Sequence, residues 1–114
     1  IIFLNRKEEL NVKVQAARSG GVLRIKLCGD MDEYSAPSVR RECDRLIDQN
    51  PTAVKIVINL SEVAFMDSTG IGFLIGRYKK ARQGGKSIFV EAPNFAADKV
   101  LTVSGIYSLI PKAE

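Results

Sequence analysis

A short apolar run at residues 54–60 constrains the fold of this chain more than any other segment. Only Lys55 and Asn59 interrupt its Val, Ile and Leu residues. Apolar residues recur at helical spacing both before this run, at residues 39–47, and after it, at residues 71–78. A buried strand between two helices is typical of a parallel crossover in an α/β domain.

Two further strands are predicted before this run. Residues 11–16 alternate polar and apolar side chains, and residues 22–28 form a second strand-like stretch. The turn-forming residues 18–21 between them, Arg-Ser-Gly-Gly, predict a hairpin with antiparallel strands. Residues 29–32 then break the strand pattern, and Ser35 is expected to cap the following helix.

The second half of the chain continues the alternation of helices and strands. The helix that begins near Ile71 is expected to stop near Gly84, and residues 87–90 predict a fourth strand. A third helix is expected to close at Ser104, before a short strand-like end at residues 106–110. The order β-β-α-β-α-β-α predicts an α/β fold with a mixed β-sheet packed with helices.

The length of 114 residues suits one domain, which we assign to residues 11–114. Residues 1–10 are interpreted as an N-terminal extension, either native or artificial. No apolar run is long enough to span a membrane, so a cytoplasmic protein without membrane contact is expected.

Composition excludes several classes of chemistry. The chain has no His, which removes imidazole bases and most zinc sites, so no metal site is predicted. Cys28 and Cys43 are expected to be reduced core thiols. The net charge of +4 comes from scattered Lys and Arg, with five Phe, three Tyr and no Trp, which argues against nucleic-acid binding.

The most informative motif is the segment Phe-Met-Asp-Ser-Thr-Gly-Ile-Gly at residues 65–72, between a strand and a helix. A helix N-terminus has free N–H groups and a positive dipole, so it tolerates an added negative charge. Ser68 is therefore a candidate phosphorylation site. The alternative is that Ser68 or Asp67 only caps the helix.

The glycines after Ser68 fit two further patterns. Gly70, Gly72 and Gly76 resemble a relaxed dinucleotide fingerprint, but such glycines should turn directly out of the preceding strand. Gly72 and Gly76 share one helix face, where they permit close approach of the sheet or of a partner protein. The pair Asp30 and Asp32 is interpreted as a solvated loop.

These residues together resemble the STAS family, and most closely its sporulation-type anti-sigma-factor antagonists. Three groups of segments carry the resemblance. They are Leu-Cys-Gly-Asp-Met-Asp at residues 27–32, the stretch 59–70 with its Asp-Ser-Thr-Gly, and residues 75–79 together with 104–106. The resemblance covers residues 11–111.

The resemblance implies a regulator that is not an enzyme and holds no cofactor. The unphosphorylated antagonist binds an anti-sigma factor that is also a serine kinase, which frees a sigma factor for sporulation or stress transcription. Phosphorylation at the position of Ser68 breaks the complex, and a serine phosphatase restores it. The expected partner-binding residues are Asp32, Asp67, Ser68, Thr69, Gly70 and Gly72. The alternative function is a STAS module of a transport complex or a signalling scaffold.

Overall fold

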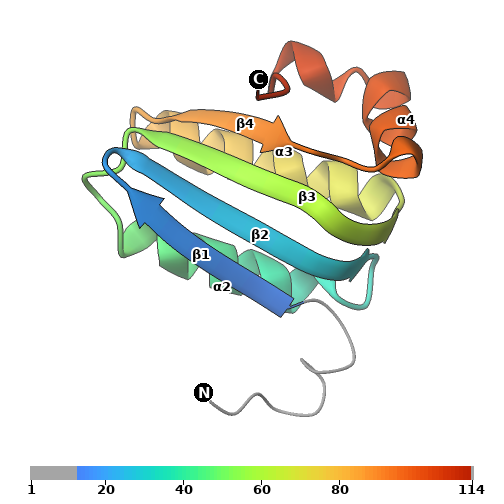
Figure 1. The fold of residues 1–114 in the computed structure, drawn as a ribbon, viewed down its shortest axis with the longest axis horizontal. Helices are drawn as coiled ribbons and strands as arrows, with labels where there is room; N and C mark the ends of the chain where they lie inside the picture. Colours follow the sequence, from blue (N-terminus) through green and yellow to red (C-terminus); the bar gives the residue numbers. More distant parts are fainter. Residues whose placement is uncertain (1–12, 114) are drawn as a thin grey trace.

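The computed structural model describes residues 13–113, in which four strands form one sheet in the order β1-β2-β3-β4 (Figure 1). The strands β1 and β2 are antiparallel, and β2, β3 and β4 are mutually parallel. The predicted mixed sheet is thus confirmed. The strand bounds are β1 (Lys13–Ser19), β2 (Val22–Met31), β3 (Lys55–Met66) and β4 (Ser87–Glu91).

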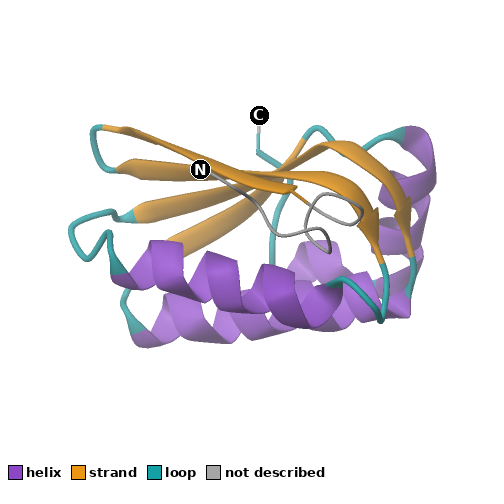
Figure 2. Ribbon diagram, turned by 90° about the horizontal axis from the view of Figure 1, so that it is seen from below, coloured by secondary structure: helices purple, strands orange, loops and turns teal. Residues whose placement is uncertain are grey.

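Two long helices cover one face of the sheet, and a third lies at its edge. The helix α2 (Ala36–Asp48) packs on β1 and β2, and α3 (Ser68–Gln83) packs on β3 and β4 (Figure 2). The helix α4 (Phe95–Ser104) lies beyond the carboxyl ends of β3 and β4, and is followed by the short 3₁₀ helix η1 (Ile106–Ser108) (Figure 1). The order of strands and helices is the predicted one.

The hydrophobic core fills the space between the sheet and the two long helices. Alternate residues of β2 and β3 point into it, as the two-residue period of a strand requires. The helices add residues at their three- and four-residue spacing. Core residues include Leu23, Ile25, Leu27, Ile56, Ile58, Leu60, Val39, Cys43, Ile47, Phe73 and Leu74.

The other face of the sheet carries a polar network across three strands. The Arg24 guanidinium donates to both carboxylate oxygens of Glu91, over 2.9 and 3.0 Å, and Asn59 Nδ2 donates to the same carboxylate over 2.6 Å. The Arg24 hydrogen bond, helped by that of Asn59, lowers the pKa of Glu91. These contacts connect β2, β3 and β4 on the side that the helices leave open.

Two strands are longer than predicted. The strand β2 continues to Met31 rather than ending at residue 28, and β3 continues to Met66 rather than ending at residue 60. The two extensions pair with each other. The register of this pairing shifts twice, once before Cys28 and once after Gly29. Gly29 has a φ of +121°, a backbone conformation that favours glycine. Pairing between distant strands therefore overrides the local break that Gly29 predicts.

Three smaller expectations were wrong. Residues 106–110 form a 3₁₀ turn and not a strand, and the sheet is instead extended by a parallel bridge between Val90 and Lys112. The Ser35 side chain does not cap α2, because its hydroxyl donates to the Asp30 carbonyl oxygen over 2.9 Å. Cys28 is only half-buried.

The expectations for Cys43 and for the hairpin turn were confirmed, and the one for residues 1–10 falls outside the described part of the chain. Cys43 is the buried core thiol that was predicted, and burial raises the pKa of this thiol to about 12. Cys28 and Cys43 are both free thiols. The hairpin turn falls at Gly20, with a φ of +56°, and Gly21. The proposed extension at residues 1–10 lies outside the described residues.

Candidate functional site

The register of β2 and β3 brings two of the predicted site residues to one edge of the sheet. Met31 pairs with Met66 in the parallel ladder. Asp32 and Asp67 directly follow this pair, so the chain leaves the sheet at neighbouring points. The resemblance assigns both acids to the expected partner surface. The strand register gives the structural reason that they lie at one edge, although the whole of α2 and β3 separates them along the chain.

Asp67 is the N-cap of α3. Its backbone is extended, with φ −119° and ψ −163°, and its Oδ1 accepts a hydrogen bond from the Thr69 N–H over 2.8 Å. Its carbonyl oxygen accepts from the Gly70 N–H over 3.0 Å. The capping role that was open between Asp67 and Ser68 therefore belongs to Asp67.

Ser68 is the first residue of α3, and its side chain is exposed. Within residues 13–113 its hydroxyl takes part in no hydrogen bond, unlike the hydroxyls of Ser35, Ser104 and Ser108. The Ser68 oxygen is thus accessible to a reacting group without the loss of any contact that holds the fold.

Gly70 and Gly72 have different reasons to be glycine. A Cβ on Gly70 would lie 2.5 Å from Met66 Cγ, so the buried first turn of α3 has no room for a side chain. A Cβ on Gly72 would meet no described atom within 4 Å, and the same is true of Gly76. The sheet therefore does not approach this face of α3 closely. Of the two neighbours predicted for the face, the sheet and a partner protein, only the partner protein remains.

Asp32 has a local structural role. Its Oδ1 accepts hydrogen bonds from the Tyr34 and Ser35 N–H groups, each over 3.0 Å. The carboxylate thereby ties the loop between β2 and α2 together, and it stays half-buried at the edge that Asp67 shares.

An apolar groove that sequence analysis did not predict lies beside Ser68. It has a volume of about 520 Å³ and runs between the start of α3 and the length of α4. Phe95 and Val103 on its α4 wall are 83% and 81% exposed, which is unusual for large apolar side chains. The lining residues are Ser68, Ile71, Phe95, Ala96, Lys99, Val100, Val103 and Ser104.

A sequence signal for this groove exists but is ambiguous. Phe95, Lys99 and Val103 recur every four residues, so they share one face of α4. Ala97 and Leu101 form another apolar face, which is buried. With apolar residues on both faces, spacing alone does not tell which one packs on the domain.

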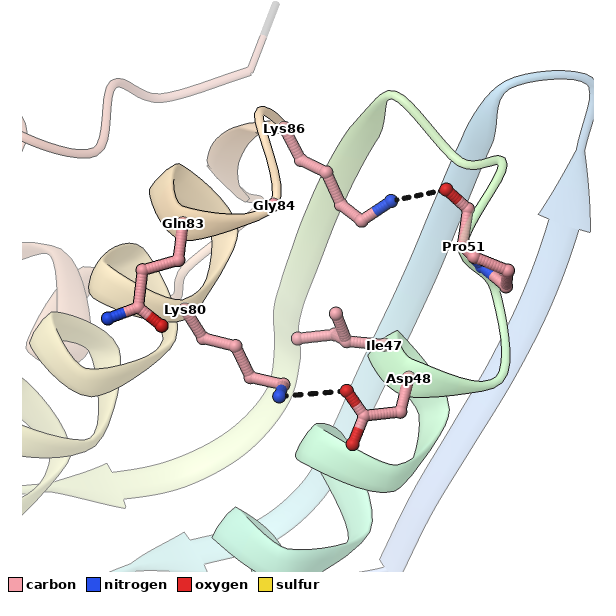
Figure 3. A pocket seen from close by; sticks show the side chains of 7 residues that line it. All are labelled: Ile47, Asp48, Pro51, Lys80, Gln83, Gly84 and Lys86. Atoms are coloured by element: carbon pink, nitrogen blue, oxygen red, sulfur yellow. Dashed lines mark hydrogen bonds and ion pairs between the residues drawn. The ribbon is translucent and has the colours of Figure 1, made fainter.

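A second hollow, of about 400 Å³, lies at the carboxyl ends of α2 and α3, away from Ser68 (Figure 3). Its charged groups already have partners. The Lys80 ammonium pairs with Asp48 over 2.8 Å, and the Lys86 ammonium donates to the Pro51 carbonyl over 3.0 Å and to the Ala53 carbonyl. The first contact joins α3 to α2, and the others join the turn before β4 to the loop after α2. The charged groups of this hollow are therefore explained by packing between these elements rather than by a binding site.

The described part of the chain contains no group of three His, Cys, Asp or Glu side chains that could hold a metal ion. Gly70, Gly72 and Gly76 all lie inside α3 and so form no phosphate-binding loop. Among residues 13–113 no helix is long and apolar enough to cross a membrane.

Comparison with known proteins identifies the family. Residues 13–113 match the STAS domain, so the chain belongs to the STAS domain family. It is 32% identical to an anti-sigma F factor antagonist of Paenibacillus polymyxa, over 90% of this chain and 86% of that protein. It is 27% identical to an anti-sigma-B factor antagonist of Bacillus subtilis (strain 168), over 89% of this chain and 90% of that protein.

Solved structures agree on the fold. The anti-sigma factor antagonist SpoIIAA in its unphosphorylated form superposes with a TM-score of 0.73 at 23% identity, covering 90% of this chain and 89% of that one. The predicted β-β-α-β-α-β-α domain is therefore a STAS domain in both sequence and architecture.

Proposed function

We propose that this protein is an anti-sigma factor antagonist, controlled by phosphorylation at Ser68. In its unphosphorylated form it binds an anti-sigma factor that is also a serine kinase, and so releases a sigma factor in the cytoplasm. The observation that carries the proposal is the free Ser68 hydroxyl at the start of α3, on the rim of an exposed apolar groove. The curated relatives supply the class of partner.

The groove is the proposed docking surface for the kinase. Its walls are almost entirely apolar, and Gly72, on the open side of α3, leaves room for a partner backbone. Asp32 and Asp67 lie at the adjoining edge of the sheet. The expected partner surface therefore presents apolar side chains to α4 and polar groups to the two acids.

The switch itself is a phosphoryl transfer. The kinase moves the γ-phosphoryl group of its ATP to Ser68 Oγ, the hydroxyl proton leaves, and ADP departs. ATP and Mg²⁺ belong to the kinase. The product carries a charge of about −1.5 to −2 at pH 7. A helix N-terminus accommodates this charge, so the domain is expected to keep its fold.

Phosphorylation ends binding because the new charge would be buried at the interface beside Asp67. A charge that loses its partners, water included, when an interface forms costs about 2–5 kcal/mol. Each ~1.4 kcal/mol is a factor of ten in affinity, so a loss of about 10²-fold or more is expected. A phosphatase that hydrolyses the phosphoserine would return the protein to its binding form.

The first test is intact mass after incubation with the candidate anti-sigma kinase and Mg-ATP. We expect one added phosphate on the wild type and on Ser108→Ala, and none on Ser68→Ala. The Ser108 variant is the matched control, because it removes another exposed hydroxyl, in η1, that is not among the expected partner-binding residues. Phosphate on Ser68→Ala, or none on the wild type with a kinase active on another substrate, would overturn the proposal.

Binding by the Ser68 variants completes the test. Ser68→Ala should bind the kinase like the unphosphorylated protein, whereas Ser68→Asp should bind more weakly and melt at nearly the wild-type temperature. Equal affinity of the two variants, measured by calorimetry, would show that charge at this position does not control docking.

A further inference from the structure

Lys99 is the basic residue among those that line the apolar groove beside Ser68. Both residues line the apolar groove, Ser68 on the α3 side and Lys99 on the α4 wall. On that wall Lys99 lies one helical turn from Phe95 and one from Val103, midway along the exposed face of α4. Its side chain is a compact charge on a flexible four-carbon stem, so it can reorient without movement of the helix.

The Lys99 ammonium is not committed to a carboxylate. Within residues 13–113 it forms no ion pair, and its described contact is with the Phe95 ring, 5.9 Å from the ring centre. The adjacent acid, Asp98, is already engaged, because it accepts from the Tyr107 hydroxyl and pairs with Lys112 over 3.0 Å. Lys99 is thus a cation in an apolar groove without a described counter-charge.

We propose that Lys99 leaves the Phe95 ring and pairs with the phosphate of phosphorylated Ser68, across the groove. This inference rests on the proposed function, because it concerns the modified form of the same site. A phosphate dianion attracts an ammonium more strongly than the face of an aromatic ring does, and it offers three acceptor oxygens.

The pair would change the shape of the docking surface as well as its charge. With the Lys99 side chain drawn from α4 towards α3, the groove is bridged by an ion pair, and apolar side chains of the partner no longer reach its walls. Phosphorylation then removes the docking surface by moving one side chain, with α3 and α4 in place.

The test is a ³¹P NMR titration of protein that carries phosphoserine at position 68, inserted during translation. The second pKa of phosphoserine is about 6, and a neighbouring ammonium lowers it. At low salt we expect Lys99→Gln to raise this pKa by about 0.2–0.7 units relative to the wild type, the size of an exposed ion pair. Lys99→Arg, which keeps the charge, should stay at the wild-type value.

Lys79→Gln is the matched control. Lys79 is an exposed lysine of α3 that forms no ion pair within the described residues and does not line the groove. An unchanged pKa in Lys99→Gln, or an equal rise in Lys79→Gln, would overturn the proposal. No kinase is used, so the titration tests the ion pair alone, and a negative kinase assay would count against the proposed function alone.

Discussion

Gly70 and Gly72 lie two residues apart in α3, yet their surroundings differ. Gly70 packs against the Met66 side chain, and Gly72 faces open space. At the residue scale this separates a glycine that the core requires from one that the fold does not need. The helical pattern of the sequence places both residues on α3 but does not show what each one meets.

Opposite effects on stability are therefore expected from the same substitution. Gly70→Ala should lower the free energy of unfolding by about 1–3 kcal/mol, because the new methyl group overpacks against Met66. Gly72→Ala should raise it by about 0.5–1 kcal/mol, because alanine is the better helix former. Urea denaturation of both variants checks this. A stable Gly70→Ala protein would mean that Met66 moves aside at little cost.

At the scale of elements, a buried ion pair joins the two long helices. Arg77 of α3 is only 5% exposed, and its Nε lies 2.9 Å from Asp44 Oδ1 of α2. The guanidinium also packs on the Phe73 ring, 5.1 Å from its centre. Burial lowers the pKa of Arg77, and Asp44 opposes that shift. The charged state of the buried Arg77 therefore depends on Asp44.

Removing Asp44 should lower the free energy of unfolding more than replacing Arg77 does. Asp44→Ala leaves the Arg77 charge buried without a partner, and we expect a loss of about 1–3 kcal/mol, since Asp44 itself is partly exposed. Arg77→Met keeps an apolar side chain of similar length and leaves the Asp44 carboxylate, which is 32% exposed, to water, so we expect a smaller loss, of less than about 1 kcal/mol. Chemical denaturation compares the two. A larger loss for Arg77→Met would show that guanidinium packing, rather than charge balance, stabilises the helix pair.

At the scale of the whole molecule, the polar network on the open face of the sheet should make the stability of the fold depend on pH. Glu91 of β4 bonds to Arg24 of β2 and Asn59 of β3, which holds its pKa below the ordinary value of 4.5. A carboxylate with a lowered pKa stabilises the folded state above its unfolded pKa. That contribution is lost as the pH falls through the folded pKa.

Glu91→Gln should therefore be less stable than the wild type by about 0.5–1 kcal/mol at pH 7, the range for a partly exposed ion pair. The difference should shrink as the pH falls below 4.5, where the wild-type carboxylate takes up a proton. Thermal unfolding from pH 3 to pH 7 checks this. The matched control is Glu62→Gln, from the more exposed pair with Lys26, for which a smaller loss of stability at pH 7 is expected. A constant difference across the range would contradict the role of ionised Glu91.

The sequence by itself determined the order of strands and helices, the mixed α/β class and the position of Ser68 at a helix start. These properties depend on periodicity and on capping chemistry within a few residues, as at Asp67 and Thr69. Local pattern also explains why the expected end of the second strand was wrong. Gly29 signals a break, but the pairing of β2 with β3 carries the strand past it.

Only the tertiary structure decided what surrounds Ser68. The approach of Asp32 to Asp67 follows from a register between strands more than thirty residues apart. The groove follows from the way α4 packs, which buries Leu101 and leaves Phe95 exposed. Contacts between distant segments depend on how complete elements fit together, and no spacing along the chain encodes which of two apolar faces turns inward.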